Sequence, residues 1–75
     1  MIKLYGREYC SLCSTMRSQL AEIGVPVLWV DIDDDPGLEE RFGDLVPVLV
    51  APSGDEICHY HLDRPALDAY LAEFS

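Results

Sequence analysis

Two cysteines, Cys10 and Cys13, are separated by two residues in a chain of 75, and a third, Cys58, stands alone. A disulfide across so short a loop constrains the unfolded chain very little, so a structural staple is a poor explanation for the pair. Small secreted domains instead use an even number of well-separated cysteines. The Cys10-Ser11-Leu12-Cys13 motif therefore indicates redox chemistry or metal binding in a reducing compartment.

The charge and composition of the chain argue against nucleic acid and membranes as binding partners. Fourteen acidic residues against five basic ones give a net charge of −9, which would repel nucleic acid and anionic membranes. Hydrophobic residues make up 49% of the chain, enough for a packed core, yet no apolar run approaches the roughly 18–20 residues of a membrane span. The first residues also lack the pattern of a signal peptide. We expect one domain over residues 1–75, cytoplasmic, with no nucleic-acid or membrane partner.

The elements that must position the dithiol follow from the hydrophobic pattern. Residues 2–5 form a short apolar stretch that reads as a strand. From Cys10 onward apolar residues recur at helical spacing until Gly24, and residues 26–32 are rich in strand formers. Strand, helix and strand in this order predict two parallel strands joined by a right-handed crossover, with the dithiol at the start of the helix.

The second half of the chain predicts two more helices and two more strands, in a different arrangement. Asp35-Pro36 opens a short helix that Gly43 ends, and residues 46–51 and 56–62 flank a turn-rich link, as in an antiparallel hairpin. Asp63 then caps a last helix. The expected fold is α/β with the order βαβαββα, a four-stranded mixed sheet flanked by three helices.

The start of the first helix gives the two thiols different tasks. A helix N-terminus offers unpaired N–H groups and partial positive charge, which stabilise a thiolate. Our hypothesis is that Cys10 attacks a target disulfide and that Cys13 resolves the mixed disulfide so formed. The alternative is that two cysteines stand at the helix start without a chemical role.

The residues around the dithiol resemble those of a known family. Residues 5–13, YGREYCSLC, look like the strand end, basic residue and dithiol of bacterial glutaredoxins, and Val46-Pro47 is similar to their cis-proline segment. Over its whole length the chain resembles small, poorly characterised glutaredoxin-like domains with a thioredoxin fold. The resemblance implies a thiol–disulfide oxidoreductase without a bound cofactor. Its substrates would be protein or small-molecule disulfides, and its reductant glutathione or a thioredoxin reductase.

The resemblance also implies residues that bind substrate. A cis bond before Pro47 would leave the backbone of Val46 open for strand-like pairing with the substrate. Arg7 would stabilise the Cys10 thiolate or a partner's carboxylate, unless it is a solvated loop residue. Tyr9 would either shield the dithiol from water or pack beside the helix.

The chain matches the glutathione-binding motif of glutaredoxins, Gly-Gly-x-x-Asp, only in part. Asp63 fits the acidic position of this motif, where it would receive the ligand's amino group, but it is equally well explained as a helix cap. His59 and Tyr60 put bulk where that motif has glycines. In addition, four acidic residues should lie at the dithiol edge and repel anionic glutathione, unless Asp34 or Asp35 caps the short helix and the others are solvated: Asp31, Asp33, Asp34 and Asp35.

The sequence is compatible with other functions. Cys58, His59 and His61 together with the dithiol would supply zinc ligands, but neighbours on a strand point to opposite faces, and Cys58 more often serves as a small buried hydrophobe. Cys58 as a peripheral redox thiol is a further reading. The competing functions are a redox-sensing or adaptor module without turnover, and a metal or iron–sulfur carrier.

Overall fold

The computed structural model describes residues 1–74 and, over this range, forms four strands and three α-helices with one short 3₁₀ turn. The elements in chain order are β1 (Ile2–Gly6), α1 (Ser11–Glu22), β2 (Val27–Asp31), η1 (Ile32–Asp34), α2 (Pro36–Phe42), β3 (Val48–Val50), β4 (Glu56–His59) and α3 (Arg64–Phe74). The predicted order βαβαββα is confirmed. No helix in residues 1–74 is long and apolar enough to cross a membrane.

The four strands form a single mixed sheet in the order β2-β1-β3-β4. β1 and β2 are parallel, with Gly6 opposite Asp31, whereas β3 runs antiparallel to both β1 and β4. The ends of β1 and β2 therefore meet the start of β3 at one edge of the sheet. The loop that leads to α1, the acidic residues after β2 and the residues before β3 all lie at this edge, which we call the dithiol edge.

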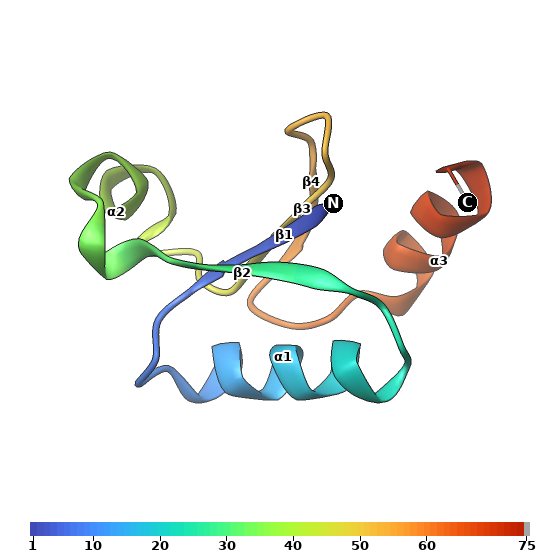
Figure 1. Cartoon of the computed structure of the whole chain (residues 1–75), viewed down its shortest axis with the longest axis horizontal. Coiled ribbons are helices and arrows are strands. Elements are labelled where there is room, and N and C mark those ends of the chain that lie inside the picture. The colour runs from blue at the N-terminus through green and yellow to red at the C-terminus, as the bar shows by residue number, and fades with distance from the viewer. Residues whose placement is uncertain (75) are drawn as a thin grey trace.

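Helices cover both faces of the sheet (Figure 1). α1 and α3 pack on one face around a core of seven buried residues, Ile2, Leu4, Met16, Leu20, Leu49, Cys58 and Leu67. α2 packs on the other face, against a smaller core of Ile32, Phe42, Val48 and Val50. Strand β3 supplies side chains to both cores in alternation, which explains why all three of its residues are buried.

Three element boundaries differ from the sequence prediction. The strand expected over residues 26–32 ends at Asp31, because the Asp31 carboxylate accepts the N–H of Asp33 at 2.9 Å and starts a 3₁₀ turn. The strand expected from residue 46 begins at Val48. The strand expected to reach residue 62 ends at His59, since Tyr60 has a φ of 64° and leaves the extended conformation.

Candidate dithiol site

Cys10 is the N-cap residue of α1. Its backbone is extended, with φ −104° and ψ 116°, and its Sγ accepts a hydrogen bond from the N–H of Cys13 at 3.2 Å. Its carbonyl accepts the N–H of Ser14 at 3.0 Å, so the helix proper begins at Ser11. The sulfur thus takes the place of the oxygen that Ser, Thr or Asp usually supplies at a helix start. The side chain is partly exposed, so an incoming molecule can reach it.

Cys13 lies behind Cys10 and is completely buried. Burial, and after it the hydrogen bond with Cys10, raise the pKa of the Cys13 thiol to about 11, and the backbone N–H of Arg7 opposes them only in part. Cys13 is therefore a protonated thiol at neutral pH. Cys10 is accessible and Cys13 is buried, which is the asymmetry that sequential attack and resolution require.

The backbone of β1 makes room for this buried sulfur. A side-chain carbon at Gly6 would lie 3.0 Å from Cys13 Sγ and 2.6 Å from Cη2 of Trp29. Only a residue without a side chain lets both groups pack against the end of the strand. The guanidinium of Arg17 covers the other side of the Trp29 ring, 4.3 Å from its centroid.

Arg7 is held by carboxylates of the protein itself. Its two terminal nitrogens contact the two oxygens of Glu39 at 2.6 and 2.7 Å, and it also pairs with Asp33 and donates to the carbonyl of Gly43 at 3.2 Å. The hydrogen bond from Arg7 lowers the pKa of Glu39, and Glu39 in turn raises the pKa of Arg7. The expectation of a solvated loop residue is wrong, because this guanidinium ties the dithiol loop to α2. A role toward substrate stays a prediction.

The acidic residues after β2 have structural roles. Asp35 accepts the N–H groups of Gly37 and Leu38 and caps α2, as one reading of the sequence expected. Asp31 caps the 3₁₀ turn, and Asp33 pairs with Arg7. Part of the negative charge at the dithiol edge is therefore neutralised or directed at backbone N–H groups.

Tyr9 stands on the surface beside the dithiol. It is 78% exposed, so it does not pack beside the helix as one reading proposed. A hydrogen bond to Asp33 raises the pKa of the Tyr9 hydroxyl. The exposed ring could cover a bound molecule next to Cys10, and this role stays a prediction.

The segment before β3 and the loop before α3 lie side by side. The Val46–Pro47 peptide bond is cis, Pro47 is buried, and its carbonyl accepts the N–H of Tyr60 at 3.0 Å. Asp63 accepts the N–H of Ala66 at 3.0 Å and caps α3, which confirms the structural reading of this residue. The binding roles expected for Val46, Pro47 and Asp63 are not tested by these contacts.

Cys58 and the two histidines do not join the dithiol. Cys58 is buried in the main core, and burial raises the pKa of its thiol. His59 is exposed and contacts Glu56 at 2.9 Å. All three cysteines are free thiols, and within residues 1–74 no three side chains of His, Cys, Asp or Glu come together in a way that would hold a metal ion.

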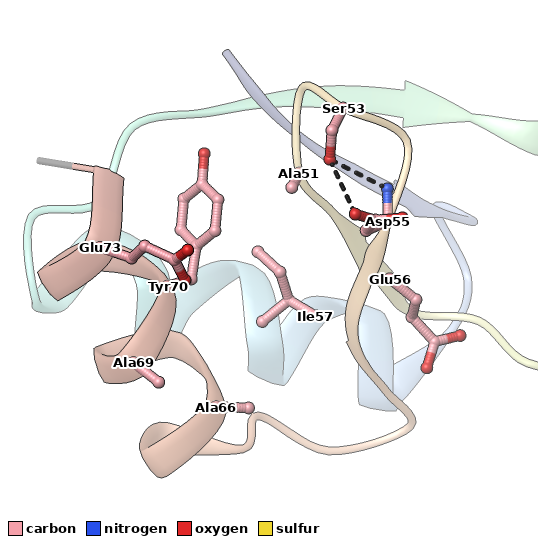
Figure 2. Close-up of a pocket in the computed structure, with 9 residues that line it drawn as sticks. All are labelled: Ala51, Ser53, Asp55, Glu56, Ile57, Ala66, Ala69, Tyr70 and Glu73. Carbon is pink, nitrogen blue, oxygen red and sulfur yellow. Dashed lines mark hydrogen bonds between the residues drawn. The ribbon is translucent and has the colours of Figure 1, made fainter.

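One hollow lies away from the dithiol, between the β3–β4 hairpin and α3 (Figure 2). It has a volume of about 240 Å³, and the hydrogen bond of Ser53 to Asp55 at 3.2 Å shapes one wall. The lining includes Asp55, Glu56 and Glu73 but no cysteine. It holds no nucleophile for disulfide chemistry, so the candidate site is the dithiol edge.

The fold and the dithiol define the class as glutaredoxin-like proteins of the thioredoxin fold. The family model of the Glutaredoxin-like domain (DUF836) matches residues 1–72, and the chain belongs to this family. Solved structures of the same shape include protein XcR50 from X. campestris, with 37% identity, full coverage of both chains and a TM-score of 0.82. Protein Ne2328 from Nitrosomonas europaea is 34% identical over 92% of this chain and 87% of that one, with a TM-score of 0.81.

Two further proteins are similar to this chain at lower sequence identity. The uncharacterized protein Rv0508 of Mycobacterium tuberculosis is 31% identical over 95% of this chain and 81% of its own length. A buckwheat glutaredoxin, solved as a complex with glutathione, shares only 15% identity over 96% of this chain and 68% of that one. Its TM-score of 0.63 is evidence for the fold alone.

Three residues at the site were not given a role from the sequence. Glu39 forms the main partner of Arg7, and no spacing signal links residues 32 positions apart. Trp29, like Cys13, packs against Gly6, and it has a buried Nε1 without a hydrogen-bond partner among the described residues. Tyr60 did carry a signal, because a glycine in the family motif marks a left-handed backbone, and Tyr60 keeps that conformation with a side chain added.

Proposed function

We propose that this protein is a thiol–disulfide oxidoreductase in which Cys10 is the nucleophile and Cys13 the resolving thiol. The observation that carries the proposal is the asymmetry of the pair. Cys10 is accessible and its sulfur accepts the N–H of Cys13 at the helix start, where thiolates are stabilised. Cys13 is buried, and its raised pKa keeps it protonated until the second step.

The proposed reaction consists of two successive thiol–disulfide exchange steps. The Cys10 thiolate attacks one sulfur of a substrate disulfide, forms a mixed disulfide and expels the other sulfur as a thiolate. Cys13 then loses its proton to solvent or to the departing thiolate and attacks Sγ of Cys10, which releases the second substrate thiol. Two electrons have moved from the dithiol to the substrate, and a Cys10–Cys13 disulfide remains. Glutathione or a thioredoxin reductase would supply the electrons that restore the dithiol in the cytoplasm.

The residues around the pair would hold the substrate. The backbone of Val46 beside Pro47 would pair with an extended segment of the substrate, and Tyr9 would cover the reacting sulfurs. Asp63 is engaged as a helix cap and Arg7 in ion pairs, so each has less capacity for a ligand than a free side chain would. This favours a peptide or protein disulfide over a small anionic one.

The experiment is reduction of a test disulfide by the purified protein with either glutathione or a thioredoxin reductase as electron donor. Turnover that depends on Cys10 supports the proposal and identifies the donor. A Cys10–Cys13 pair that oxidises reversibly but gives no turnover with either donor would favour a redox sensor or adaptor. Metal analysis of the same preparation tests the third function, a metal or iron–sulfur carrier.

A further inference from the structure

A small cavity lies beside the Cys-x-x-Cys motif, lined by Leu12 but by neither cysteine, and has no role in the steps described above. It lies between the first half of α1 and the loop that joins β4 to α3, and its volume is about 100 Å³. On the helix it is lined at the spacing of one face, beginning with Leu12, which stands between the two cysteines. The opposite wall is formed by the loop, chiefly by Tyr60 and Leu62.

The lining of this cavity contains no carboxylate. The chain carries a net charge of −9, yet the remaining lining residues are Thr15, Met16, Gln19 and His61. Met16 is buried beneath the cavity, whereas Leu12 and Tyr60 are 38% and 42% exposed and stand at its rim. The cavity therefore suits a neutral apolar group and not an anion or a fully solvated cation.

Tyr60 is fixed at both ends. Its N–H donates to the carbonyl of Pro47 at 3.0 Å, and its hydroxyl donates to the carbonyl of Asp44 at 2.9 Å, so the ring lies alongside residues 44–47. The ring of His59 meets the ring of Tyr60 edge-on at 4.6 Å. A φ of 64° is a costly conformation for a bulky residue, and such outliers persist where the surroundings determine them and often serve a function.

We propose that Leu12 and Tyr60 form a specificity subsite that receives the aliphatic side chain next to the reactive cysteine of a peptide disulfide. This inference rests on the proposed function and names its substrate class. Leu12 lines the cavity and lies between Cys10 and Cys13 in the chain, so a substrate whose cysteine bonds to Cys10 places its neighbouring residue within reach. Since an apolar cavity of about 150 Å³ holds a benzene ring, a space of about 100 Å³ fits Val or Leu better than Phe or Trp.

The test measures formation of the mixed disulfide in the Cys13→Ser background, by mass spectrometry, against a series of peptide disulfides. The peptides differ only in the residue next to the cysteine, which is Leu, Gly, Phe or Asp. We expect the Leu peptide to react about tenfold faster than the Gly peptide, the discrimination that a hydrophobic pocket gives for a few methylenes. The Phe and Asp peptides should gain nothing over Gly, and glutathione disulfide should react more slowly than the Leu peptide.

Two variants test whether the preference for the Leu peptide over the Gly peptide depends on Leu12 and Tyr60. Tyr60→Gly, which suits the left-handed backbone, and Leu12→Ala should each bring the ratio of the Leu to the Gly rate close to one. The control is Ile23→Ala, which removes a similarly exposed apolar side chain at the far end of α1 and should keep the ratio. Equal rates for Leu and Gly peptides, or a preference that survives both cavity variants, would overturn the subsite.

The proposed function has its own readout in the same experiment. A small uncharged aromatic disulfide needs no side-chain pocket, so its reaction reports on Cys10 alone. If it forms a mixed disulfide while the peptides show no preference, only the subsite is wrong. If no disulfide of any kind reacts with Cys10, both the oxidoreductase and its subsite are excluded.

Discussion

The backbone N–H of Cys13 donates to Sγ of Cys10 at 3.2 Å. The residue that would resolve the mixed disulfide therefore also stabilises the sulfur that would make the first attack. The hydrogen bond uses one of the N–H groups that every helix start leaves unpaired. It requires a spacing of three residues between cap and donor, which is the spacing of the Cys-x-x-Cys motif. The motif therefore serves both the helix and the chemistry.

Single substitutions in the pair should separate the two steps. Cys10→Ser is expected to abolish reduction of a test disulfide, because the accessible sulfur at the helix start is lost. Cys13→Ser keeps the backbone N–H and should still attack, but it stops at the mixed disulfide, which mass spectrometry detects as an adduct of one substrate half. Activity retained by Cys10→Ser would show that another thiol is the nucleophile.

The pH dependence of the second step should report the burial of Cys13. Burial raises the pKa of its thiol to about 11, so the reactive thiolate increases about tenfold for each pH unit above neutrality. Part of the rise in pKa comes from Cys10, which is uncharged in the mixed disulfide, so the rate should level off somewhat below pH 11. Rapid quenching of a preformed mixed disulfide gives the rate at each pH. A rate that is flat between pH 7 and 9 would contradict a protonated Cys13.

The sequence was informative about the order of the elements and less so about how their ends are joined. Hydrophobic spacing and the caps at Asp35 and Asp63 depend on neighbours along the chain, and they predicted the helices well. The ion pair of Arg7 with Glu39 joins residues from different elements, so no local pattern signals it. The strand start expected at residue 46 and the strand end expected at residue 62 were misplaced. The apolar pattern extends over Pro47 and Tyr60, but the paired strands do not include these two residues.

The bidentate pair of Arg7 with Glu39 should add stability that depends on pH. Arg7 lowers the pKa of Glu39 in the folded chain, so the pair stabilises the fold above the ordinary carboxyl pKa. The contribution is lost as the pH falls through the lowered value. Glu39→Gln should therefore unfold at lower denaturant concentration at pH 7, and the difference from the parent should shrink in acid. Glu40→Gln removes the same charge one position along α2 and should change stability less at pH 7. An equal loss from both variants would mean that only net charge matters.

Cys58 should behave as a packing residue. It is buried in the core under α1 and α3, so Cys58→Ala leaves a small void and should cost about 1 kcal/mol in the free energy of unfolding. Disulfide reduction should stay at the parent rate, measured at a temperature where both proteins are folded. In the parent, alkylation at neutral pH should modify Cys10 well before Cys58, whose thiol has a raised pKa. Loss of activity in Cys58→Ala would instead assign this thiol to the redox cycle.

Gly6 should be the backbone position at which stability and thiol chemistry are most tightly linked. In Gly6→Ala the added carbon would meet Trp29 Cη2 at 2.6 Å and Cys13 Sγ at 3.0 Å, and neither can retreat without moving α1 or β2. Overpacking of this kind typically costs about 1–3 kcal/mol. The matched control is Gly37→Ala in the first turn of α2, where the added carbon meets only Oδ1 of Asp35 at 3.3 Å and helix propensity improves. Urea unfolding, followed by the fluorescence of Trp29, measures the free energy of unfolding of both variants.

The same displacement of Cys13 Sγ should also slow its attack on Cys10 in the mixed disulfide. Gly6→Ala should therefore lengthen the lifetime of that intermediate, while Gly37→Ala should not. A Gly6→Ala protein with parent stability and parent kinetics would mean that the strand end yields easily and does not position Cys13.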